Sequence, residues 1–129
     1  MAADRSDRID TQRRDDVLNA LGDGTRRAIL DLLAARPRAV GELATELPVT
    51  RPAVSLHLRV LRDAGLVTST AAGTQRIYRV DPDGLALLRT YLELLWTRAL
   101  QGFAAAAEAE HRGGPGSGRP PHPKGQPHA

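Results

Sequence analysis

The chain has 129 residues, a formal net charge of +3 and no cysteine, and it contains only one tryptophan, one phenylalanine and two tyrosines. This length suits a single domain whose modest core is built from aliphatic side chains. The lack of cysteine excludes disulfides, thiolate metal sites, iron–sulfur clusters and a cysteine nucleophile.

The two ends of the chain differ in composition from its middle. Residues 1–10 are mostly polar or charged, and residues 112–129 are rich in glycine, proline and polar side chains. Because such segments bury too little apolar surface to order themselves, we expect a flexible N-terminus over 1–10, a folded domain over 11–111 and a disordered tail over 112–129. No stretch approaches the roughly 18 apolar residues of a membrane span, and no signal peptide is recognisable. We therefore expect a cytoplasmic protein without a membrane partner.

Apolar spacing predicts two helices in the first third of the chain. Val17, Leu18 and Leu21 indicate a short helix over about 11–21. Asp23 is a suitable N-cap for a second helix over about 24–35, which ends before Pro37.

Two further short helices are predicted to meet across a tight turn. The third begins near Val40 and must stop at Pro48, which cannot donate a hydrogen bond into the preceding turn. Thr50 is a suitable N-cap for the fourth, which tolerates Pro52 in its first turn and continues to Gly65.

The remainder of the predicted domain is a hairpin followed by a long helix. Strand-like segments over 66–70 and 75–80 flank a turn expected at Ala71, Ala72 and Gly73. The last helix starts at Asp81 and Pro82, and its apolar residues recur at alternating steps of three and four: Leu85, Leu88, Leu92, Leu95, Ala99 and Phe103. Such a seam is typical of a helix that packs against a partner helix.

This order of elements is that of a winged helix-turn-helix, so we predict a mainly α fold with a small β hairpin. In that unit the second helix of the motif enters the major groove of DNA. On the fourth helix the aliphatic Val54, Leu58 and Leu61 share the inward face, and the residues that project away from them are Arg51, Ser55, Arg59 and Arg62.

Charge supports a nucleic-acid partner. Between Thr50 and Val80 there are five arginines and one aspartate, a net charge of +4 that exceeds the +3 of the whole chain. Basic side chains concentrated on a reading helix and its wing are suited to phosphate and guanine contacts.

A catalytic reading of the same helix fails on geometry. Ser55 and His57 are two residues apart, so they lie roughly 200° apart around a helix and do not face one another. The neighbouring carboxylates Asp15 with Asp16 and Asp81 with Asp83 stand at helix starts, where they suit the positive end of the helix dipole rather than acid/base chemistry, and no glycine-rich phosphate loop is present. We therefore expect no catalytic residues, no cofactor and no enzymatic activity.

Four segments together resemble the ArsR family of bacterial winged-helix repressors. They are LNALGDGTRRAIL at 18–30, GELA at 41–44, RPAVSLHLRVLRDAGLV at 51–67 and RIYRVD at 76–81. The resemblance covers about residues 15–100, and as a set these motifs are highly specific.

The resemblance implies a homodimer joined through the first and last helices, which binds double-stranded DNA. The resemblance and the outward positions of the fourth helix together give the predicted DNA-binding residues. They are Thr50, Arg51, Pro52, Ser55, Leu56, Arg59, Arg62, Gly73, Thr74 and Arg76. The dimer-interface residues it implies are Val17, Leu88, Leu92, Leu95, Trp96, Ala99 and Phe103.

The sequence departs from the family where metals bind. The third helix has no thiol, and the last helix has no histidine before His111, so we predict no metal site. Pro48 stands where such turns commonly have glycine, and the wing tip over 70–74 carries no basic residue.

We predict a regulator that represses transcription as a homodimer on a palindromic operator whose halves lie about 34 to 36 Å apart. Two alternatives stay open. One is a sensor of the same fold that responds to a metal or an unidentified small-molecule effector, and the other is a winged helix that binds only protein.

Overall fold

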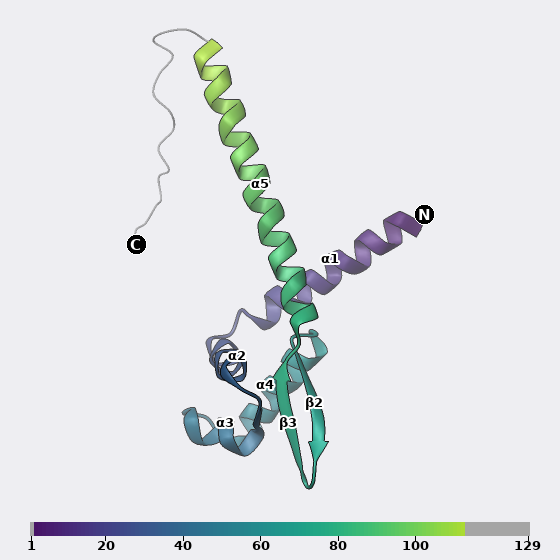
Figure 1. Ribbon diagram of the computed structural model, residues 1–129, viewed down its shortest axis with the longest axis vertical. Coiled ribbons are helices and arrows are strands. Elements are labelled where there is room, and N and C mark those ends of the chain that lie inside the picture. The colour runs from purple at the N-terminus through teal and green to yellow at the C-terminus, as the bar shows by residue number, and fades with distance from the viewer. Residues whose placement is uncertain (1, 113–129) are drawn as a thin grey trace. The chain divides into compact units, whose positions relative to one another are not determined.

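The computed structural model describes residues 2–112. In chain order its elements are α1 (Ala2–Ala20), α2 (Gly24–Ala35), β1 (Arg38–Ala39), α3 (Val40–Glu46), α4 (Arg51–Asp63), β2 (Val67–Ala72), β3 (Gln75–Val80) and α5 (Pro82–Arg112) (Figure 1). The order of helices and hairpin confirms the predicted fold class. Residues 113–129 of the predicted tail lie outside the described residues. No helix within 2–112 has the length and apolar character needed to cross a membrane.

The predicted helix caps are present. A carboxylate oxygen of Asp23 accepts hydrogen bonds from the amides of Thr25 (2.7 Å) and Arg26 (3.2 Å) at the start of α2. The Thr50 hydroxyl accepts from the amide of Ala53 at 3.3 Å at the start of α4. These bonds satisfy amides that have no partner within the helix, so they fix where α2 and α4 begin.

Helix α1 is longer than predicted. It begins at Ala2 rather than near residue 11, so the expected start is wrong. Residues 2–10 contain neither proline nor glycine, and polar side chains pair at helical spacing, as in the Gln12–Asp16 hydrogen bond (2.9 Å) and the Arg13–Asp10 ion pair (3.9 Å). Such pairs support helix in the N-terminal stretch of α1, which has no apolar face and so gives no periodicity to detect.

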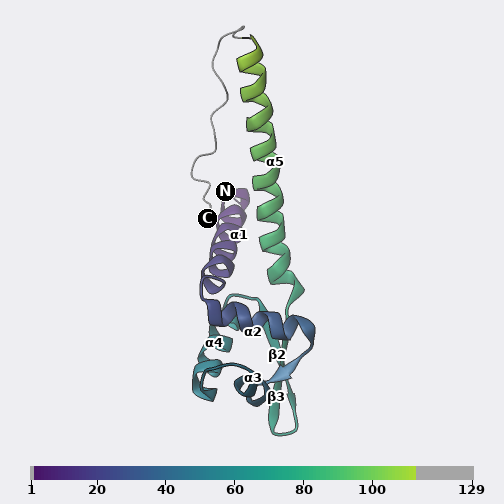
Figure 2. The same cartoon turned by 90° about the vertical axis from the view of Figure 1, so that its left-hand side faces the viewer.

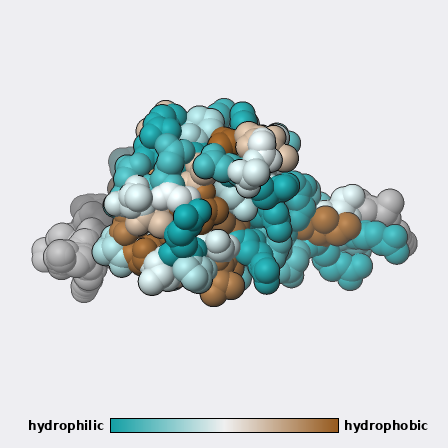
Figure 3. Space-filling model, turned by 90° about the horizontal axis from the view of Figure 1, so that it is seen from below, coloured by the Kyte–Doolittle hydropathy of each residue, from teal (hydrophilic) through white to brown (hydrophobic). Residues whose placement is uncertain are grey.

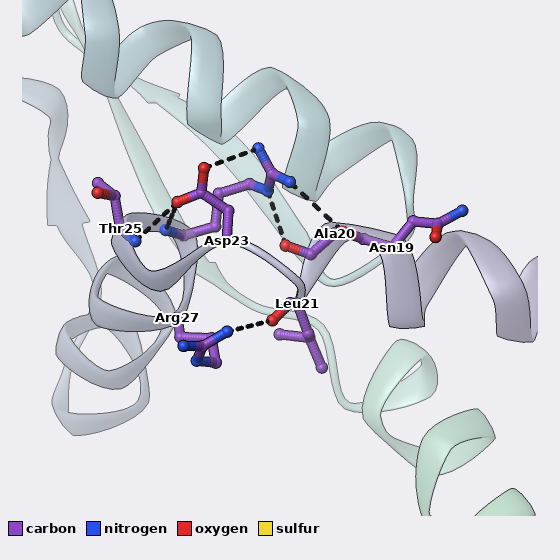
Figure 4. A network of polar contacts seen from close by, with 7 residues as sticks. Asn19, Ala20, Leu21, Asp23, Thr25 and Arg27 are labelled. Carbon is purple, nitrogen blue, oxygen red and sulfur yellow. Dashed lines mark hydrogen bonds and ion pairs between the residues drawn. The ribbon is translucent and has the colours of Figure 1, made fainter.

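The joint between α1 and α2 is held by two arginines (Figure 4). Arg26 donates from Nε to the carbonyl of Ala20 at 2.7 Å, and it also forms an ion pair with Asp23. Arg27 donates to the carbonyl of Leu21 at 2.8 Å. The last carbonyls of α1 thus receive the donors that a helix C-terminus lacks, which orients α1 on α2.

We expect the charge on Asp23 to make stability depend on pH. Hydrogen bonds from the backbone amides of Arg26 and Thr25 lower the pKa of Asp23. A lowered pKa adds stability above the unfolded pKa of about 3.9, and that stability is lost as the pH falls through the folded value. Asp23→Asn keeps a capping side chain without the charge. Its melting temperature should be below that of the wild type at pH 7, and the gap should close below about pH 4.

Asp31→Asn is the matched control for this prediction, because Asp31 is an exposed aspartate of the same helix. Thermal unfolding followed by circular dichroism between pH 3 and 7 measures both differences. A gap for Asp23→Asn that stays constant over this range would contradict the assigned role of the cap.

The sheet has one more strand than predicted. Its order is β1-β3-β2, all antiparallel, with Arg38 opposite Tyr78 and Ala39 opposite Ile77. The hairpin strands pair as far as Ala72 and Gln75, so the turn is shorter than expected and consists of Gly73 and Thr74. Gly73 has φ +65°, which suits the first position of a type II′ turn. Two residues are too few for β1 to appear as a pattern in the sequence.

The core lies between the helices and the base of the hairpin. The views in Figures 1 and 2 place α3 and α4 beside β2 and β3, and α2 contacts both β3 and α4. The completely or almost completely buried side chains come from the four helices α1 to α4, from β2 and from the residue before it: Val17, Ile29, Leu43, Val54, Leu58, Leu61, Leu66 and Val67. Val17, which the resemblance assigned to the dimer interface, has no exposed surface; its side chain packs in the core of the chain and offers no surface to a partner.

The chain divides into two compact units, at 1–91 and 92–129, so that α5 has one part in each. In the first unit Leu88 is half-buried and packs against the core, and Arg14 stacks 4.3 Å from the ring centre of Tyr91. In the second unit the side chains of Leu92, Leu95, Trp96 and Phe103 are 43% to 74% exposed, and Leu100 is 52% exposed. These apolar residues and Ala99 recur on one side of the helix.

Candidate nucleic-acid interface

Helix α4 is held by its inward face. Val54, Leu58 and Leu61 are at most 1% exposed and pack among the core side chains. After the helix, Gly65 takes φ +84°, and the amide of Leu66 donates to the carbonyl of Leu61 at 2.9 Å. Both ends of α4 are therefore capped by hydrogen bonds, and the buried inward side chains fix the orientation of its outward face.

The outward face carries the side chains that the sequence assigned to DNA. All six are exposed: Arg51, Pro52, Ser55, Leu56, Arg59 and Arg62. Thr50 is exposed as well, although its hydroxyl already caps the helix. The end of the molecule near the hairpin tip is mostly hydrophilic, with apolar side chains set among polar ones (Figure 3).

Arg51 lies closer to α3 than helix projection alone suggests. A Cβ built on Gly41 would stand 3.3 Å from a terminal nitrogen of Arg51, so the guanidinium passes over the first turn of α3. Gly41 leaves this space open. Arg51 therefore marks the edge of the outward face, while Leu56 and Arg59 are nearer its centre.

The hairpin adds arginines on both of its faces. Arg76 donates to the hydroxyl of Ser69 at 3.2 Å, and Arg79 donates to the hydroxyl of Thr70 at 3.5 Å. Gly73 and Thr74 are exposed at the tip. Arg79 was not among the predicted site residues, although alternation along β3 places it on the face opposite Arg76.

The sequence also gave no sign of the contacts that hold α3 beside β1. Glu42 accepts from the amide of Ala39 at 3.0 Å and pairs with Arg36 at 3.2 Å. Arg38 is buried and pairs with Glu46 at the end of α3. A buried arginine with a carboxylate partner is costly to leave unpaired, so this pair fixes α3 and the turn that precedes α4.

The cationic side chains of this surface are available to a ligand. The five arginines at 51, 59, 62, 76 and 79 are exposed, and within residues 2–112 none of them forms an ion pair with a carboxylate. A cluster of three or more histidine, aspartate or glutamate side chains that could hold a metal is not found in the described part of the chain. The site can bind anionic groups and hydrogen-bond to base edges.

Comparison with known proteins agrees with this geometry. The family model for bacterial regulatory proteins of the ArsR family matches residues 23–69. The HTH-type transcriptional regulator Rv2034 of Mycobacterium tuberculosis is 60% identical over 91 residues, which are 70% of this chain and 85% of that protein. The chain belongs to the ArsR family.

Solved structures of the ArsR family have the same fold. An ArsR-like transcriptional regulator from Rhodococcus sp. RHA1 aligns with a TM-score of 0.70 and 32% identity, over 77% of this chain and 93% of that one. A homodimeric winged helix-turn-helix DNA-binding domain from Mycobacterium bovis, a possible ArsR-family regulator, aligns with a TM-score of 0.60 and 31% identity, over 77% of this chain and 91% of that one. This ArsR-family chain is thus a winged helix-turn-helix transcriptional regulator.

Proposed function

We propose that this ArsR-family regulator acts as a homodimer, binds a palindromic operator through α4 of each subunit and represses transcription by covering the promoter. The observation that carries the proposal is the contrast between the two faces of α4. Its inward side chains are at most 1% exposed, whereas Arg51, Arg59 and Arg62 are exposed and form no ion pair with any carboxylate among residues 2–112. A helix anchored in this way can present arginines rigidly to the major groove.

The wing supports the same proposal. Arg76 and Arg79 are exposed on opposite faces of the hairpin, where each is suited to contact phosphates beside the groove. Gly73 and Thr74 form the tip. We assign Arg79 to this surface in addition to the residues predicted from sequence.

The second half of the proposal is the dimer. The dimer seam is the set of exposed apolar α5 residues from 92 onward that lie on one side of the helix, with Leu100 added to the predicted residues: Leu92, Leu95, Trp96, Ala99, Leu100 and Phe103. Leu88, which was also predicted, packs against the core. Six or more apolar side chains per subunit, at about 1.5 to 3 kcal/mol each, are enough to offset the entropy of association. A regulator of this kind acts in the cytoplasm by binding alone, without catalysis.

Replacing Arg59 with alanine tests the proposed reading face. We expect a loss of about 1 to 3 kcal/mol of binding free energy for DNA taken from upstream of the protein's own gene, because one guanine or phosphate contact disappears from each half-site. Fluorescence anisotropy with a labelled duplex measures the affinity.

Arg13→Ala is the matched control for the Arg59 variant. It removes the same charge from an exposed position on α1, where the ion pair with Asp10 is a surface pair of little energetic weight. We expect its affinity to stay within about twofold of the wild type. Equal affinities of the Arg59 and Arg13 variants for the upstream DNA would contradict the assignment of α4 as the reading helix.

A further inference from the structure

Leu56 is unusual for a side chain at the centre of a cationic surface. It is 61% exposed, although it is a large aliphatic residue on a helix whose other leucines, Leu58 and Leu61, are buried. At about 100° per residue it projects at least about 140° away from each buried residue of α4. Nothing in the packing of the subunit accounts for an aliphatic side chain at this position.

The neighbours of Leu56 extend this apolar surface along one stripe. Pro52 precedes it by four residues, and Val60, which is 40% exposed, follows it by four. Side chains at this spacing lie about 5 to 6 Å apart on a helix surface. Arg59 lies one turn after Leu56 on the same side, and Ser55 and Arg62 are on the flank. The stripe is therefore apolar at its centre, has arginines beside it, and ends at the exposed carboxylate of Asp63 in the last turn of α4.

We propose that Leu56 reads the 5-methyl group of a thymine in each half of the operator. This inference rests on the proposed function, since it requires that α4 enter the major groove. The thymine methyl is the apolar group that a base pair presents in that groove, and the other base edges present donors and acceptors. A leucine packed against those polar base edges would remove their donors and acceptors from water without giving them a hydrogen-bond partner, and this costs binding free energy.

The charge around Leu56 favours DNA over a protein as its partner. An apolar protein surface would leave Arg59 and Arg62 without an anion, whereas the phosphates on each side of the groove supply one.

The position of Arg59 relative to Leu56 also indicates which base pair lies next to the thymine. Arg59, one turn along, is in reach of the next base pairs and is suited to a bidentate contact with guanine. We therefore assign an A·T pair beside a G·C pair to each half-site.

Replacing single thymines by deoxyuridine tests the proposal, because this change removes the methyl group and keeps every hydrogen-bonding atom. The probe is the upstream duplex that wild-type protein protects, with one thymine at a time replaced at equivalent positions of the two halves. The proteins compared are the wild type, Leu56→Ala and Arg59→Ala, and thermal unfolding shows that each is folded. Because Leu56 is exposed, its alanine variant should melt close to the wild type.

At one position of the half-site we expect deoxyuridine to weaken wild-type binding about fourfold for each half, which corresponds to the ~0.8 kcal/mol of one buried methylene-sized group. Leu56→Ala should bind thymine DNA more weakly and lose this sensitivity. Arg59→Ala should bind more weakly and keep it.

Two results would overturn the proposal in distinguishable ways. In the first, deoxyuridine changes the affinities of the wild type and Leu56→Ala equally at every position, while both still prefer the upstream DNA. The proposed function then stands, and the thymine contact is wrong. If the wild type has no preference for the upstream DNA, the proposed function fails and the thymine contact with it.

Discussion

Replacing Gly84 with alanine is expected to destabilise the protein by about 3 kcal/mol, at the upper end of the usual cost of adding a methyl group to a closely packed site. Gly84 lies in the first turn of α5 and is buried. A Cβ at this position would stand 2.2 Å from the carbonyl oxygen of Gly65 and 3.2 Å from the Cα of Leu66. Both contacts are backbone atoms, so no side-chain rotation can relieve them.

The close approach at Gly84 joins the end of α4 to the start of α5. The amide of Asp81 donates to the carbonyl of Leu66 at 2.8 Å, and Leu66 itself is fully buried. Moving α5 away to make room for a methyl group would break this contact and expose part of the core. The melting temperature should fall by roughly 12 to 24 °C, since about 4 to 8 °C correspond to each kcal/mol in a domain of this size.

Gly102→Ala is the matched control for the Gly84 variant. It adds the same methyl group to the same helix at a position where a Cβ meets no atom within 4 Å. Alanine has the higher helix propensity, so we expect a neutral or slightly stabilising effect. Similar melting temperatures for the two variants at equal protein concentration would show that the packing of α5 on Gly65 is not as described.

Replacing Leu92 with aspartate is expected to dissociate the proposed homodimer. Leu92 is 52% exposed and lies in the dimer seam. Each dimer loses two leucine side chains at about 1.5 to 3 kcal/mol each and places two carboxylates in an apolar interface. The dissociation constant should rise at least about hundredfold. Sedimentation velocity at micromolar concentration should show a dimer for the wild type and a monomer for the variant.

Thr97→Asp is the control for charge on α5. Thr97 is exposed and lies about 140° from Leu92 around the helix, outside the dimer seam. This variant should sediment as the wild type does. A monomeric wild type, or a Leu92 variant that remains dimeric, would contradict the assignment of the seam.

Local signals in the sequence account for most of the fold. Asp23 and Thr50 fix the starts of α2 and α4 because their side chains accept amide hydrogen bonds at these positions. Pro48 likewise limits α3, since proline cannot donate into a helical turn. The inward face of α4 follows from its spacing alone. These features depend on residues close together in the chain, and the structure confirms them.

The features that the sequence did not predict depend on contacts between distant residues or lie in a polar segment. The spacing of Val17 indicates only an apolar helix face, and the packing of α1 on the core shows that this side chain is buried within the chain. The pairing of Arg38 with Tyr78 in β1 joins residues 40 positions apart. The first turns of α1 lie in an exposed polar stretch, where hydrophobic periodicity gives no signal. Among the site residues, the exposed positions on α4 were predictable, whereas the placement of Arg51 over Gly41 required the three-dimensional structure.

Specific operator binding is decided by the affinity of the purified protein for DNA from upstream of its own gene, compared with its affinity for random DNA of equal length. The measurement is made at about 150 mM salt, because phosphate contacts weaken steeply as salt rises. The account predicts a preference of about a thousandfold or more for the upstream DNA. Equal and weak binding to both duplexes would contradict it and would indicate that this winged helix binds another protein.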